Sequence, residues 1–351
     1  MWVAVALTVA CTKASKEPKK DKPETKRQPP PPRLSKALRV DVNAFSPDPA
    51  DHAGVMIRFD RIRRSALGRA TEKLLSVLPD HHRVVGYTGR RVTDAFDLVL
   101  ITSSNPSLQT ATNMSARMAI PPGKMRALLD NKVFATRWLP VLGGALGKAN
   151  VPGWDPRVYL IPMIDWIVLV KPNSLGWLSA ERKGDYDLFQ PPAKLPAWLR
   201  NVPQLAGIGP RRLVALGALD KLPKTISPPM VGSIDMPQHL RAALERGKHV
   251  DVLSGELVFA TPAKAAAFEK AASAGRSILR AYKPQAGGPH IPAIAALRKL
   301  RLHQSGKHLQ FSMAMTRAQT VELTRYAIGL VTNMMAPPVP PTPPPQPPPT
   351  P

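Results

Sequence analysis

The chain has 351 residues and a formal net charge of +25, from 49 Lys and Arg against 24 Asp and Glu. Hydrophobic residues make up 44% of it and aromatic residues only 5%, so a globular core must be built mainly from aliphatic side chains. A single cysteine excludes an intramolecular disulfide framework and any zinc site that relies on several thiolates. The charge favours anionic partners such as membrane surfaces, cell-wall polymers or nucleic acid.

The first eleven residues are typical of a secretory signal segment. An apolar run covers residues 2–10, and Ala10 supplies the small residue that a signal peptidase needs. Ending in TVAC at residues 8–11, the segment resembles the lipobox of bacterial lipoproteins. That resemblance implies a lipid on Cys11, and Thr12 in place of Asp implies sorting to the outer membrane. The alternative is a plain apolar N-terminus with an incidental cysteine, and the run is shorter than the roughly 20 residues of a transmembrane helix.

Two polar, proline-rich stretches flank the middle of the chain. Residues 12–39 hold ten Lys and Arg against three Asp and Glu, and residues 337–351 hold eleven prolines and no charge. Neither stretch can bury enough apolar surface to offset the entropy of ordering. We therefore expect a disordered basic tether at 12–39 and a disordered polyproline tail at 337–351. Between them the chain keeps a basic charge of its own.

The hydrophobic pattern of residues 40–171 predicts a first α+β module. Val55, Ile57 and Phe59 alternate with other residues as in a half-buried strand, and apolar residues then recur at the helical period. In chain order the pattern predicts a strand at 55–59, a helix at 62–78, a strand at 96–101, a strand at 114–120, a short helix after Pro121 and Pro122, and strands at 157–161 and 166–170.

Residues 172–212 are rich in Pro, Gly and Trp and predict a connector to a second α+β module at 213–336. Thr261 and Pro262 favour a helix start, and Thr316 with Gln319 forms a capping-box pattern. The elements predicted here are a strand at 230–234, a helix at 237–246, a hairpin at 250–260 about Ser254-Gly255, a helix at 262–281, a helix at 291–300, a hairpin about Ser305-Gly306 and a helix at 317–333.

A unit of alternating strand, cap or proline, and amphipathic helix recurs at 116–130, 257–270 and 312–324. It predicts two split β-α-β modules with mainly antiparallel sheets and helices on one face; the alternative is one larger sheet without duplication. The segment AGVMIRFDRIRRSALG at 53–68 and the later units resemble predicted envelope lipoproteins of uncharacterised function, over residues 50–130 and 225–333. That resemblance implies a fold and a compartment but no activity.

Catalytic and cofactor motifs do not occur in the sequence. It contains no G-x-S-x-G nucleophile elbow, no glycine-rich phosphate loop and no H-E-x-x-H metal motif. His303 and His308 flank the Ser305-Gly306 turn, and with no neighbouring Cys or carboxylate in sequence we interpret them as exposed hairpin histidines. We expect no catalytic residues, no cofactor and no metal.

Basic doublets are the remaining candidate site residues. Arg63-Arg64 and Arg90-Arg91 are predicted to bind anions, with anionic lipid, lipopolysaccharide or a cell-wall polymer as partner. Aromatic residues that would stack on bases do not accompany them, which disfavours nucleic acid. The sequence thus predicts a non-enzymatic envelope lipoprotein that binds or scaffolds at the cell surface. The alternatives are an exported hydrolase with an unrecognised site and an intracellular nucleic-acid-binding protein.

Overall fold

The computed structural model describes residues 32–325, apart from 77–78, 82–84, 86–88, 107, 131–135, 142–143, 150–155, 164, 176–194, 222–224, 227–233, 282–295 and 297. Cys11 and the tail at 337–351 lie outside the described residues. The described strands are β1 (Ala53–Arg58), β2 (Phe96–Ser103), β3 (Thr112–Met118), β4 (Thr136–Val141), β5 (Gly144–Ala149), β6 (Val158–Met163), β7 (Trp166–Val170), β8 (Leu213–Asp220), β9 (Thr225–Ile226), β10 (Ile234–Asp235), β11 (His239–Arg246), β12 (Val250–Val258), β13 (Arg301–Ser305) and β14 (His308–Thr316).

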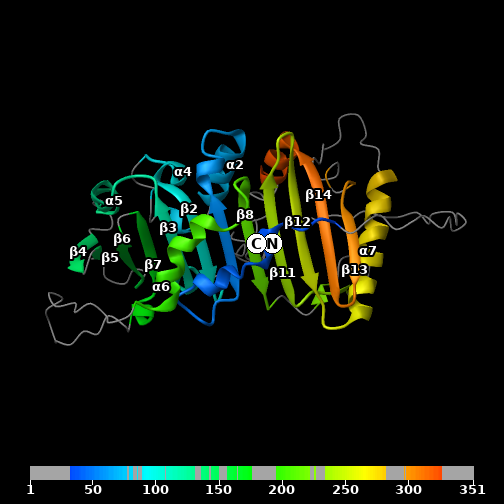
Figure 1. The fold of residues 1–351 in the computed structure, drawn as a ribbon, viewed down its shortest axis with the longest axis horizontal. Coiled ribbons are helices and arrows are strands. Elements are labelled where there is room, and N and C mark those ends of the chain that lie inside the picture. The colour runs from blue at the N-terminus through cyan, green and yellow to red at the C-terminus, as the bar shows by residue number, and fades with distance from the viewer. Residues whose placement is uncertain are drawn as a thin grey trace, which may run out of the picture.

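Twelve of these strands form one sheet in which all neighbours are antiparallel. Its order is β13-β14-β12-β11-β8-β1-β2-β3-β7-β6-β5-β4, and β9 pairs separately with β10 (Figure 1). The helices are α2 (Ala66–Leu75), α3 (Pro79–His81), α4 (Val92–Ala95), α5 (Pro122–Leu129), α6 (Ala197–Asn201) and α7 (Pro262–Ala281), with short 3-10 helices η1 (Lys36–Arg39), η2 (Val42–Phe45), η3 (Phe59–Arg61) and η7 (Val202–Gly207). The α+β class predicted from the sequence is confirmed.

The two faces of the sheet are covered differently. We call face A the one that carries α2, α5 and α7. On it, Leu67 of α2 and Met125 of α5 lie in one apolar cluster with residues of β1 to β4 and β6 to β8. Phe268 of α7 lies in a second cluster with residues of β8 and β11 to β14. Leu244 of β11 contacts both of these apolar clusters, which places them on one face.

Face B is the opposite face, which carries η1, η2, α6 and η7. These short helices bury Val42, Leu199 and Val202 against strand residues such as Leu98 and Leu216. This cover extends over β1, β2, β5 to β8 and one residue of β11. β1, β2, β6 and β7 therefore bury apolar residues on both faces, whereas β11 to β14 are buried mainly on face A.

β8 joins the two halves into one sheet. Its Leu219 lies between Ala53 of β1 and Leu240 of β11, and it hydrogen-bonds along both edges. The predicted pair of separate split β-α-β modules is therefore wrong, and the single larger sheet is the correct alternative. The physical reason is that residues 213–220, an apolar run that the sequence analysis left without an assigned strand, have a strand partner on each side.

Two elements of the second half differ from their predictions. The predicted helix at 237–246 is the strand β11, because pairing with β8 and β12 satisfies its backbone on both edges. Its Leu240 faces α7 and its Ala243 faces η1. Because these buried residues are three positions apart, the sequence has the spacing that is typical of a helix. The predicted turn at Ser254-Gly255 lies within the continuous strand β12.

Several local predictions are confirmed. The Thr316 hydroxyl accepts from the Gln319 N–H at 3.2 Å, and the Thr316 N–H donates to the Gln319 side chain at 3.0 Å, which completes the predicted capping box. Thr261 caps α7 by accepting from the Lys264 N–H at 3.3 Å. The predicted turn at residues 305–306 connects β13 and β14, with Gly306 at φ 58°. Most of the strand predicted at 230–234 and of the helix predicted at 291–300 falls outside the described residues.

Two segments predicted to lie outside the modules belong to the folded part. Residues 36–39, assigned from sequence to the tether, form η1, in which Ala37 and Leu38 are buried. Residues 197–207, assigned to the connector, form α6 and η7 and pack on face B through Trp198 and Leu205. Both segments are short, and their apolar residues share one cluster with strand residues on face B.

Candidate anion-binding surface

The four arginines proposed from sequence lie at one end of the sheet, where α2 and α4 meet (Figure 1). Arg63 and Arg64 lie between η3 and α2, and Arg90 and Arg91 directly precede α4. The two doublets are 27 positions apart in the chain. The structure therefore brings together residues that the sequence offered only as separate pairs.

Arg63 fastens this end of the fold. Its guanidinium donates to the carbonyl oxygens of Thr93 and Phe96, the latter at 3.0 Å, and pairs with the Asp97 carboxylate at 2.7 Å. Arg117 of β3 approaches the same carboxylate at 3.4 Å. Because Arg63 is held by three groups of the protein, its contribution is to position the surface rather than to supply a free cation.

Glu72 of α2 fixes the start of α4. Its carboxylate accepts from the N–H groups of Val92 and Thr93 at 2.8 and 3.0 Å, and it contacts His81 at 3.2 Å. Burial raises the pKa of the Glu72 carboxyl, but the bonds from His81 and the two N–H groups lower it further, so its pKa lies below the usual value. The ionised carboxylate holds residues 90–91 beside α2.

The remaining cations of this region face solvent. Arg91 pairs with Asp94 at 2.8 Å, and this contact raises the pKa of Arg91. Arg64 and Arg90 are exposed. Along α2 the structure adds two exposed cations that the sequence analysis did not select, Arg69 and Lys73. Arg69 and Lys73 do not form a basic doublet, which is the pattern that identified the other arginines. Their spacing of four is also typical of the polar side of any amphipathic helix.

We call this region the arginine surface, defined by Arg63, Arg64, Arg69, Lys73, Arg90 and Arg91. Counting Arg117, seven cations lie here against the three carboxylates of Glu72, Asp94 and Asp97. The formal surplus is therefore +4. Arg64, Arg69 and Lys73 form no ion pair with a carboxylate among the described residues. Such an arrangement can attract an anion without first breaking an internal contact.

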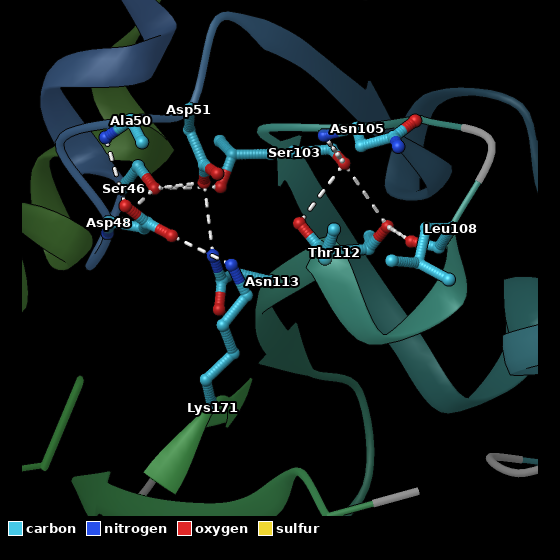
Figure 2. A network of polar contacts seen from close by, with 12 residues as sticks. Ser46, Asp48, Ala50, Asp51, Ser103, Asn105, Leu108, Thr112, Asn113 and Lys171 are labelled. Atoms are coloured by element: carbon cyan, nitrogen blue, oxygen red, sulfur yellow. Dashed lines mark hydrogen bonds and ion pairs between the residues drawn. The ribbon is translucent and has the colours of Figure 1, made fainter. Parts of the chain in front are cut away.

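A second polar cluster lies on face B, in the loop before β1 (Figure 2). The Asp51 carboxylate accepts from the Asn113 side-chain amide at 3.0 Å and from the Ser46 hydroxyl. Asp48 pairs with Lys171 at 2.7 Å. The Ser46 hydroxyl also accepts from the Thr102 hydroxyl at 2.9 Å. These contacts tie the loop to β2, β3 and the end of β7, which is a structural role.

Histidines and acidic residues of the described segments do not gather in groups of three that could hold a metal ion. His303 and His308 lie on β13 and β14, two residues out of direct register, on face B. None of the helices in the described ranges is both long and apolar enough to cross a bilayer.

Comparison with known proteins adds little at this point. No family model and no curated protein matches the chain. Among solved structures, crystal forms I and III of the protein TP0453 each match with a TM-score of 0.43 and 8% sequence identity. The match covers 84% of this chain and 98% of that chain. A likeness this distant carries no argument about function.

Proposed function

We propose that this chain is an envelope lipoprotein, anchored through Cys11, whose basic globular region binds anionic material of the cell envelope without catalysing a reaction. The observation that carries the binding function is the arginine surface, where exposed Arg64, Arg69 and Lys73 lack a carboxylate partner among the described residues. The lipobox-like TVAC at residues 8–11 supports the anchor, and Thr12 in place of Asp supports the outer membrane as its location.

Charge contacts of this kind predict a particular binding behaviour. Exposed charges are screened over about 8 Å at physiological ionic strength, so affinity for anionic lipid, lipopolysaccharide or a cell-wall polymer should fall steeply as salt rises. Each cation near an anionic surface contributes on the order of 1 kcal/mol, so three cations can change affinity by about a hundredfold.

The anchor is tested by growing cells with radioactive palmitate. The parent chain should incorporate the label and fractionate with membranes, and Cys11→Ala should do neither. Because the chain has a single cysteine, no other thiol can take the acyl group. Unchanged labelling in Cys11→Ala would refute the lipoprotein assignment.

The binding surface is tested on the purified Cys11→Ser chain with phosphatidylglycerol vesicles. Arg64→Glu/Arg69→Glu/Lys73→Glu should reduce vesicle binding by at least tenfold at low salt, and neutral vesicles should bind neither protein. The matched control is Lys124→Glu/Arg126→Glu/Lys270→Glu, which changes the net charge equally at exposed positions of α5 and α7. An equal loss in both variants would mean that net charge, rather than this surface, governs binding.

A further inference from the structure

The strands β11, β12, β13 and β14 have two chemically different faces. On face A they bury apolar side chains against α7, whereas most of the side chains on face B are polar and partly exposed. The cross-strand register arranges the face B residues in two adjacent rows. The first row is His303, Gln310, Glu256 and Arg241, and the second is Ser305, His308, Val258, His239 and Asp220. We call this region the histidine face.

Three of the chain's eight histidines therefore share one surface. His308 lies 3.1 Å from the Glu256 carboxylate and His239 lies 2.8 Å from that of Asp220, with imidazole exposures of 41% and 50%. His303 is half-buried on the neighbouring strand. All three rings therefore reach solvent.

Protonation reverses the formal charge of this face. Its other charged strand residues are Arg241, Arg301, Asp220, Glu245 and Glu256. Two arginines against three carboxylates give −1, and three protonated histidines change this to +2. Histidine is the side chain that ordinarily gains its charge between pH 8 and 5, while carboxylates ordinarily stay ionised there. The exposed cations of the adjoining N-terminal segment, Arg33, Lys36 and Arg39, add a constant +3.

The chain that leads to Cys11 also reaches the fold on this face. The Ser35 N–H donates to the buried Ser254 hydroxyl of β12 at 3.4 Å, and η1 contacts β11. Figure 1 shows this segment, in dark blue, crossing in front of the strands. Between Pro32 and Cys11 there are 20 residues, which span at most about 70 Å. An anchor at Cys11 would thus keep the histidine face within reach of the membrane that carries it.

We propose that the histidine face docks on the anionic phospholipid surface of the anchoring membrane when the pH falls below neutrality. The inference rests on the proposed lipoprotein anchor and assigns a second, conditional contact to the side of the domain opposite α7. The arginine surface, built from groups that stay charged throughout this range, supplies the contact that does not depend on pH. His52 lies beyond the end of the face, where its carbonyl oxygen accepts from the Asp220 N–H at 2.8 Å.

The test measures binding of the Cys11→Ser chain to phosphatidylglycerol vesicles at about pH 7.5 and about pH 5.5. The parent should bind about tenfold more tightly at the lower pH, as expected for a few added charges at an anionic surface. His239→Gln/His303→Gln/His308→Gln should keep the binding measured at the higher pH and lose the increase. His249→Gln, an exposed histidine in the turn between β11 and β12, is the control and should keep the increase.

The outcomes separate this inference from the proposed function. An increase that is absent in the parent, or that persists in the triple histidine variant, overturns the histidine face. An acid increase for soluble heparin without one for vesicles overturns the membrane as its partner. Loss of binding at the higher pH in Arg64→Glu/Arg69→Glu/Lys73→Glu, with the acid increase retained, supports both surfaces. If the parent binds only at the lower pH, the arginine surface fails and the histidine face stands.

Discussion

The two halves of the sheet differ in how their two faces are covered by helices. β1, β2, β6 and β7 have apolar residues on both faces, covered by α2 and α5 on face A and by η2, α6 and η7 on face B. β11 to β14 have α7 on face A and leave polar side chains largely uncovered on face B. Strands buried on both faces are fixed by packing, whereas a one-sided sheet leaves one face free to meet a partner. A function that needs a broad, exposed sheet surface would therefore use face B of β11 to β14.

The largest effect expected from this difference is on stability. Leu100→Ala, on face B of β2, removes a side chain that is 1% exposed and should lower the free energy of unfolding by about 2–5 kcal/mol. Gln310→Ala, on face B of β14, should change it by less than about 0.5 kcal/mol. Urea unfolding of both variants checks the comparison. A large loss in Gln310→Ala would mean that face B of the second half is covered after all.

A smaller effect distinguishes two glycines of the same row on face A. A Cβ at Gly255 would lie 2.2 Å from the Phe311 ring and 2.4 Å from the Arg241 carbonyl oxygen, whereas a Cβ at Gly217 would find its nearest neighbour at 3.8 Å. Gly255→Ala should therefore destabilise the chain by about 1–3 kcal/mol. Gly217→Ala should be neutral or stabilise it by up to about 1 kcal/mol, because alanine restricts the unfolded chain.

Thermal melts of the two glycine variants measure the difference directly. Equal melting temperatures would show that the Phe311 ring moves aside and that the strand β12 tolerates the shift of its neighbour β11. The pair also tests why a glycine occurs at position 255, where the sequence predicted a turn. Glycine is needed there for a close approach of ring and backbone within a continuous strand, as the contacts indicate.

Local signals in the sequence predicted much of the first half. Strands β2, β3, β6 and β7 and the helix α5 show clear alternation, apolar runs or proline at a helix start, and all of them appear near their predicted positions. The capping box at Thr316 and Gln319 is equally local. These features depend on neighbours within a few residues, which is why the sequence was enough.

The rest depends on distant partners. β11 carries apolar residues on both sides only because α7 and η1, far away in sequence, meet on it. The candidate site shows the same limit. The two arginine doublets can be found in the sequence, but their proximity depends on long-range contacts, from Arg63 to Thr93 and from Glu72 to the first residues of α4. The grouping of three histidines needed the register of β11, β12, β13 and β14, which no local pattern contains.

The smallest expected effect concerns acid stability in the first half. Partial burial raises the pKa of the Asp48 carboxyl, but the hydrogen bonds from Lys171 and from the Ala50 N–H, together with the charge of Lys171, lower it below its usual value. A carboxyl with a lowered pKa in the folded state stabilises the protein above its unfolded pKa, and this contribution is lost as the pH falls through the folded pKa. Asp48→Asn should therefore cost roughly 0.5–1 kcal/mol at neutral pH, and the difference from the parent should vanish well below about pH 4.

A double-mutant cycle with Lys171→Met isolates this pair, whose side chains are 20% and 25% exposed and 2.7 Å apart. The matched pair in the second half is Asp235 with Lys264, 3.1 Å apart and more than two-fifths exposed on both sides. Solvent screens that pair more strongly, so Asp235→Asn should show no measurable acid-dependent change. Unfolding curves recorded from neutral to acid pH distinguish the two. Equal profiles for both variants would mean that Asp48 and Lys171 are as exposed in solution as the second pair, and that the loop before β1 is not fastened to the end of β7.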